Sequence, residues 1–166
     1  GEIENLLKTL PETIKPLAKK YARFDHAIYL GRDVAYPTAL EGALKLKEIS
    51  YIDANAYPTG ELKHGPLALV DDRFFELILL PKDSLYEKSL SGIQEVLARG
   101  GNALVLTDAE DFNLPVSDVV KITTKTHLLT PLLFNVLMQL FAYYITTAKG
   151  LNVDQPRNLA KSVTVE

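Results

Sequence analysis

Short apolar runs alternate with longer amphipathic stretches along most of this 166-residue chain. A run of about four to eight apolar residues, bounded by turn residues, is typical of a buried strand. Strands that alternate with helices form a mainly parallel sheet, because the helices make the crossovers. The pattern therefore predicts an α/β fold of three layers, with a five-stranded sheet and helices on both faces. The five strands are expected at residues 26–31, 55–57, 75–80, 103–107 and 118–122.

Capping and helix-breaking residues place the ends of the expected helices. The first helix should be interrupted near Pro11 and Pro16, because a proline inside a helix removes a backbone donor. Ser84 is positioned to cap one helix, and Thr130 is a capping residue followed by a proline at the first helical position of the last one. The helices are expected at residues 1–22, 37–49, 84–99 and 130–148.

The last helix has the length of a membrane span. Residues 128–148 carry no charged side chain, and about 20 apolar residues are enough to cross a bilayer. However, the polar residues Asn135, Gln139, Tyr143 and Thr146 recur at helical spacing and form a stripe. This pattern favours a buried central or interface helix over a membrane span.

Composition and charge narrow the class of protein. Hydrophobic residues make up 47% and charged residues 23% of the chain, as in soluble globular domains. The net charge of −3, without any run of like charges, argues against nucleic acid as a partner. Cysteine is absent, so this chain has no disulfide and no thiol nucleophile, and a reducing cytoplasm is compatible with it. No signal-peptide pattern is visible at the start.

We expect one α/β domain with two short extensions. Residues 1–25 form a helical lead-in, residues 26–150 form the α/β domain, and residues 151–166 form a tail whose polar and charged composition differs from the rest. Ligands of such folds bind beyond the carboxyl ends of the strands. The loops at residues 31–36 and 58–66 occupy that position and carry suggestive side chains.

Three charged residues share one face of the second helix. Glu41, Lys45 and Glu48 are spaced at i, i+4 and i+7, which stacks an acid, a base and a second acid. Their plain interpretation is an exposed salt-bridged face, worth about 0.2 to 0.5 kcal/mol per pair. Their functional interpretation is a carboxylate base held on a rigid helix. Spacing alone does not separate the two.

Single histidines and lysines carry weaker signals. Gly60 precedes His64 by four residues, and Gly65 and Pro66 follow it directly. These residues should fix the backbone around a side chain that is able to transfer protons near neutral pH. His26 and His127 are less specific, and no two histidines have metal-ligand spacing. Lys161, near the C-terminus, would ordinarily be a solvated charge.

Glu41, Lys45, Glu48, His64 and Lys161 all lie in three continuous segments, and these segments together are far more specific than any single residue. Residues 36–51, 60–69 and 154–166 closely resemble segments of the glucosamine-6-phosphate synthases, the isomerizing glutamine:fructose-6-phosphate amidotransferases. The closing segment is the most distinctive, and the resemblance extends over the full chain. It implies a sugar isomerase (SIS) domain of flavodoxin-like fold. It also implies conversion of fructose 6-phosphate and glutamine-derived ammonia to glucosamine 6-phosphate in the cytoplasm.

The resemblance also assigns roles to residues. It implies that Lys161 forms a Schiff base with the open-chain ketone, that Glu48 moves a proton between C1 and C2, and that His64 assists ring opening from the neighbouring subunit of a homodimer. It places Glu41, Lys45 and Ala160 among the residues that contact the substrate. It implies no cofactor and no metal.

Two parts of such a synthase are missing from this chain. The glutaminase half of the family uses an N-terminal cysteine, and its main sugar-phosphate loop, rich in Ser and Thr, belongs to a preceding sister SIS domain. Residues 89–92 are a poor imitation of that loop because they fall inside a predicted helix. The chain is therefore expected to be a second SIS domain, with the sister domain and the glutaminase domain as partners.

Two other functions are compatible with parts of the pattern. A free-standing aldose–ketose isomerase could use Glu48 and His64 for a proton shuttle, but simple isomerisation needs no Schiff-base amine such as Lys161. A non-catalytic module that binds sugar phosphates or mediates dimerisation would need none of these residues for chemistry.

Overall fold

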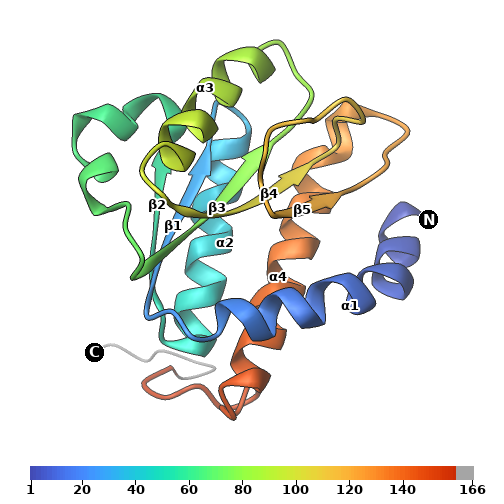
Figure 1. The fold of residues 1–166 in the computed structure, drawn as a ribbon. Coiled ribbons are helices and arrows are strands. Elements are labelled where there is room, and N and C mark those ends of the chain that lie inside the picture. Colours follow the sequence, from blue (N-terminus) through green and yellow to red (C-terminus); the bar gives the residue numbers. More distant parts are fainter. Residues whose placement is uncertain (160–166) are drawn as a thin grey trace, which may run out of the picture.

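A five-stranded parallel sheet forms the centre of the protein, as shown in a computed structural model that describes residues 1–159. The strand order is β2-β1-β3-β4-β5, and every neighbouring pair is parallel (Figure 1). The predicted α/β class is confirmed. The strands are β1 (His26–Gly31), β2 (Asp53–Pro58), β3 (Phe74–Leu80), β4 (Asn102–Thr107) and β5 (Asp118–Lys121).

Helices cover both faces of the sheet, as the sequence predicted. On one face pack α1 (Glu2–Tyr21), α2 (Ala35–Ser50) and α4 (Thr130–Ala148). The other face holds α3 (Tyr86–Leu97) and the 3-10 helix η1 (Thr59–His64) (Figure 1). Two further 3-10 helices, η2 (Pro66–Leu69) and η3 (His127–Leu129), lie in the connections.

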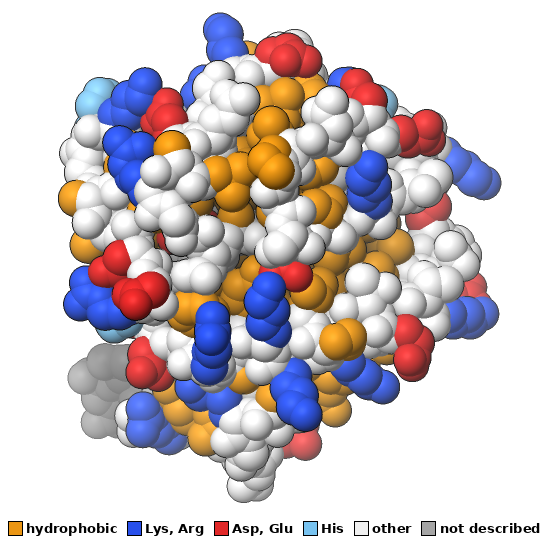
Figure 2. Space-filling view, in the orientation of Figure 1, with side chains coloured by type: hydrophobic (Ala, Val, Ile, Leu, Met, Phe, Trp, Pro, Cys, Tyr) orange, Lys and Arg blue, Asp and Glu red, His pale blue; other side chains and the backbone are white. Residues whose placement is uncertain are grey.

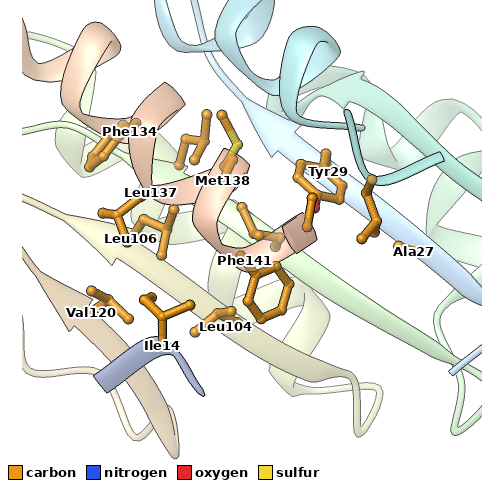
Figure 3. Close-up of a cluster of buried hydrophobic side chains, with 14 of the residues drawn as sticks. Ile14, Ala27, Tyr29, Leu104, Leu106, Val120, Phe134, Leu137, Met138 and Phe141 are labelled. Carbon is orange, nitrogen blue, oxygen red and sulfur yellow. The ribbon is translucent and has the colours of Figure 1, made fainter. Parts of the chain in front are cut away.

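The larger hydrophobic core lies between the sheet and α1, α2 and α4. Side chains of α4, including Phe134 and Leu137, point towards residues of β4 and β5 (Figure 3). Gly42 allows α2 to approach α4 closely, because a Cβ there would run into the sulfur of Met138. The central strands β1, β3 and β4 are buried on both faces and appear as mostly apolar runs, which is why the sequence predicted their bounds to within one residue.

A second core lies between the sheet and α3. Ile78, Val105 and Ile93 belong to it, and all are essentially inaccessible to solvent. Glu76 of β3 lies on the same face of the sheet and is also fully buried. Its two carboxyl oxygens have no hydrogen-bond partner among the described residues.

Within the described residues, α4 and the η3 turn before it form the one helical segment long and apolar enough to cross a membrane. In this structure α4 packs against α1 and α2 and contributes many residues to the larger core. The predicted polar stripe is only partly confirmed. Gln139 and Tyr143 are exposed, whereas Thr146 is fully buried and donates its hydroxyl to the carbonyl of Ala142 at 2.7 Å.

The predicted interruption of the first helix is wrong. Helix α1 continues through Pro11 and Pro16. A proline inside a helix costs about 3 kcal/mol or more. Burial of one face of α1, including Leu10, Ile14 and Tyr21, against the rest of the core outweighs that loss.

Two predicted caps are also wrong. Ser84 caps nothing; the carboxylate of Asp83 instead accepts the N–H of Leu85 just before α3. Thr130 does not cap α4 but donates its hydroxyl to Asp108 at 2.7 Å. Thr130 does not cap because the helix begins one residue earlier than expected: Thr130 is its first residue, and Leu129 occupies the N-cap position.

Candidate functional site

The charged face of α2 forms as its spacing predicted. Lys45 Nζ lies 2.8 Å from Glu48 Oε2 and 3.7 Å from Glu41 Oε1. The hydrogen bond to Glu48 raises the pKa of Lys45 and outweighs the opposing effect of burial. The three side chains are 30% to 43% exposed. Lys45 therefore orients Glu48 while leaving it open to solvent, which suits both a surface ion pair and a base awaiting a substrate.

A hollow lies beside this face. It measures about 500 Å³ and lies between α2 and the edge strand β2, with Glu41, Leu44 and Tyr57 among its lining residues. Leu44 is 44% exposed, as is the neighbouring Leu40 at 45%. The Glu41 end of the charged face thus borders a partly apolar surface.

His64 is held at the end of η1. Its Nδ1 lies 2.7 Å from Glu61 Oε2, and the imidazole is largely exposed. Gly65 follows with a φ of 149°, a conformation that favours glycine. Gly65 therefore supplies a turn conformation that a larger residue would rarely adopt, and the His64 ring is open to solvent.

Within one chain, Glu48 and His64 lie apart. Glu48 is near the end of α2, shortly before β2 begins, and His64 lies shortly after β2 ends. Strand β2 has six residues, which span about 20 Å at ~3.3 Å per residue. The two side chains are therefore at opposite ends of the sheet.

The described part of the C-terminal tail is attached near Glu48. The backbone N–H of Arg157 donates to the hydroxyl of Tyr51 at 2.8 Å, and its guanidinium lies 4.0 Å from the Tyr51 ring centre. Tyr51 directly follows α2 and has a φ of 62°. The predicted site residues Ala160 and Lys161 lie outside the described residues.

Asp108 is a candidate polar centre that sequence reasoning missed. Its carboxylate lies at the carboxyl end of β4 and accepts hydrogen bonds from the Lys82 N–H at 2.6 Å and the Thr130 hydroxyl at 2.7 Å. His127 Nδ1 is 2.9 Å away. Burial alone would raise the pKa of Asp108, but the bonds from Thr130 and His127 outweigh it and hold the pKa below its usual value. Its position directly after a predicted strand was the available signal.

No group of three or more histidine or acidic residues with metal-binding geometry occurs among residues 1–159. The remaining histidine, His26, lies 3.6 Å from Asp53 at the opposite, amino-terminal edge of the sheet.

Comparison with known proteins identifies close relatives. A family model described as the SIS domain matches residues 20–149. The chain is 49% identical over 166 residues to the glutamine–fructose-6-phosphate aminotransferase (isomerizing) of Aquifex aeolicus, covering 99% of the chain and 28% of that protein. It is also 49% identical to the aminotransferase of the same name from Thermus thermophilus, covering 99% of the chain and 27% of that protein.

A solved structure agrees with these relatives. The C-terminal domain of glucosamine-fructose-6-phosphate aminotransferase from Francisella tularensis superimposes with a TM-score of 0.87 and 43% identity, over 93% of this chain and 44% of that one. The chain thus spans little more than a quarter of the Aquifex and Thermus relatives and under half of the solved chain.

Proposed function

Because this chain belongs to the SIS domain family, we propose that it is the second SIS domain of a glucosamine-6-phosphate synthase. The observation that carries the proposal is the 49% identity to such aminotransferases over 99% of the chain. The whole enzyme would convert fructose 6-phosphate and glutamine-derived ammonia to glucosamine 6-phosphate. This domain would supply part of the isomerase site, and the sister SIS domain and the glutaminase domain would supply the rest.

Three residues would divide the chemistry. The amine of Lys161 adds to the C2 ketone of the open-chain sugar and releases water, which gives an iminium. Ammonia then adds to C2 and the Lys161 amine leaves, which gives the iminium of the sugar with ammonia. The iminium acidifies the C1–H bond, and the Glu48 carboxylate takes that proton and returns it at C2. His64 assists ring opening by proton transfer. Glu41, Lys45 and Ala160 would contact the substrate.

The position of the tail supports this division. Arg157 is anchored on Tyr51, just after the helix that carries Glu48. Lys161 follows Arg157 by four residues (157 to 161), which corresponds to a reach of at most about 14 Å. The chain length therefore allows the amine and the carboxylate to act on one substrate. Homodimerisation and a cytoplasmic location belong to the same proposal.

Replacing the proposed base tests the proton transfer. In the complete isomerase half, Glu48→Gln should abolish solvent deuterium exchange at C1 and C2, because the amide keeps the shape and loses the basicity. Exchange is measured by NMR of the recovered sugar phosphate. Glu87→Gln, an exposed acid in the first turn of α3, is the matched control and should exchange at the normal rate. Near-normal exchange in Glu48→Gln would assign the base to another residue.

Replacing the proposed amine tests the Schiff base. Lys161→Arg keeps the charge but should be inactive, because a guanidinium stays protonated and forms no imine. Borohydride added with fructose 6-phosphate should reduce the imine and attach the sugar covalently to the unmodified protein, and mass spectrometry should find no adduct on the arginine variant. An equal adduct on both proteins, or turnover by the variant, would contradict the role of Lys161. Isomerisation without ammonia incorporation would favour the free-standing isomerase.

A further inference from the structure

A basic hollow lies on the other side of the domain from the charged face of α2, at the carboxyl ends of β1 and β2. We propose that it binds the phosphate group of a small phosphate monoester, at a site separate from Glu48 and Lys161. Its volume is about 280 Å³, near the lower limit of ~300 Å³ for small-molecule sites. The side chains that matter here are Arg32, Thr59, Lys63, Lys88, Ser91 and Glu95.

The hollow carries an excess of positive charge. Three cationic side chains, Arg32, Lys63 and Lys88, line it together with one carboxylate, Glu95. Glu95 is 3.0 Å from Lys63, and neither Arg32 nor Lys88 forms an ion pair with any described residue. Figure 2 shows Lys and Arg side chains gathered at the upper left, over η1 and α3. The excess of two positive charges matches a phosphate monoester, which carries close to two negative charges at neutral pH.

Buried polar groups of the hollow lack partners. Thr59 is only 4% exposed, and its hydroxyl has no hydrogen-bond partner among the described residues. The buried Nε–H of Arg32 also has no hydrogen-bond partner among the described residues. Leaving such a group buried and unpaired is unfavourable, because it has lost its hydrogen bonds to water. A bound anion that accepts from both would remove that cost, which distinguishes the hollow from an ordinary basic surface.

Two glycines keep the hollow open. A Cβ on Gly60 would lie 3.0 Å from the Arg32 guanidinium, and a Cβ on Gly92 would run into the side chain of Thr59. Larger residues at these positions would press on the two groups that lack partners. The backbone can therefore approach a ligand closely between η1 and α3.

The strand order gives an independent reason to expect a ligand here. The chain leaves β1 through α2 to reach β2 on one side of it, and then returns to form β3 on the other side. In an open parallel sheet with this strand order, the usual ligand crevice lies at the carboxyl ends of β1 and β3. Arg32, after β1, and the helix α3, which follows β3, border that crevice and also line the hollow. Arg32 directly follows β1 and Thr59 directly follows β2. The hollow is built from those two strand ends and the neighbouring face of α3.

Binding to the 166-residue chain tests the proposal directly. Inorganic phosphate and fructose 6-phosphate are titrated separately, while the backbone amides of Gly60 and Gly92 are followed by NMR. Both probes should shift these amides with a dissociation constant on the order of 1 mM, and binding should weaken as salt is raised. Lys88→Gln, at an exposed position, should weaken binding by at least about fivefold.

The controls make the outcome decisive. Lys8→Gln removes the same charge from the exposed surface of α1 and should bind as the unmodified chain does. Arg32→Gln should weaken binding at least as much as Lys88→Gln, with its fold checked by the same spectra. Absence of shifts up to about 20 mM of either probe, or equal affinity in the Lys88→Gln and Lys8→Gln variants, would overturn the proposal. The experiment measures binding and not turnover. The phosphate-site proposal can therefore fail while the proposed catalysis holds, and the proposed catalysis can fail while the phosphate site is confirmed.

Discussion

Glu76 shows how one residue can make the stability of the domain depend on pH. It is fully buried on β3, and Val70, Val96 and Gly101 lie around it on the α3 side of the sheet. Burial raises the pKa of Glu76 to about 8. At neutral pH the buried side chain therefore keeps its proton, whereas in the unfolded chain it would lose it.

Glu76→Gln should remove much of this dependence. Between the ordinary pKa of a glutamate, about 4.3, and the folded value near 8, the folded state binds a proton that the unfolded state has released. Stability should therefore fall by up to about 1.4 kcal/mol per pH unit as pH rises through this window. The neutral amide avoids this loss. Urea unfolding from pH 5 to 8.5 measures how the free energy of unfolding depends on pH. Glu87→Gln is the exposed control and should show the same dependence as the unmodified chain. An equal dependence in the Glu76→Gln variant and the unmodified chain would refute the explanation.

At the scale of elements, the contact between α2 and α4 depends on the absence of a side chain at Gly42. Gly42→Ala would place a Cβ against the Met138 sulfur. The overpacking should cost about 1–3 kcal/mol, and the better helix propensity of alanine returns at most about 1 kcal/mol. We expect a net loss of stability in thermal or urea unfolding. Combining Gly42→Ala with Met138→Ala should cost less than the sum of the single changes, and strict additivity would show that the two side chains do not meet.

The strands could be predicted from the sequence to within two residues. The central strands β1, β3 and β4 are buried and mostly apolar, whereas the edge strand β2 has exposed polar positions and begins two residues before its predicted start. Helix ends and interruptions were less predictable, since they depend on distant contacts. Thr130 resembled a cap, but it is the first residue of α4, and its hydroxyl donates to Asp108 on the loop after β4. Pro11 resembled a break, but the packing of Leu10 and Ile14 kept α1 continuous.

At the scale of the whole molecule, the candidate site is divided between two ends of the domain. The sequence predicted the charged face of α2, which the structure has. It also predicted that glycines and a proline constrain the loop around His64, where the structure has a 3-10 helix followed by Gly65 at a positive φ. Spacing could not reveal that β2 separates them, because that depends on where the strand lies in the sheet. This separation is the arrangement expected if His64 serves the neighbouring subunit, and that role stays a prediction.

Mixing two inactive variants tests the shared site. In complete isomerase halves, Glu48→Gln and His64→Asn should each be inactive as homodimers. A mixed dimer has one site with both defects and one with none, so random exchange should restore roughly a quarter of normal activity. Native mass spectrometry of differently tagged chains confirms the exchange. Confirmed exchange without recovery would place His64 in the site of its own subunit.

The order of elements along the chain also has a consequence for synthesis on the ribosome. Helix α4 is the last described helix, yet it packs against α1, the first, and α2, and it supplies much of the larger core (Figure 3). A nascent chain that ends before Thr130 contains all five strands but leaves the apolar faces of α1 and α2 open to water. Such intermediates tend to aggregate. The larger core is therefore completed only after α4 has been synthesised. A translational pause before α4 would prolong the time for which the nascent chain depends on chaperones.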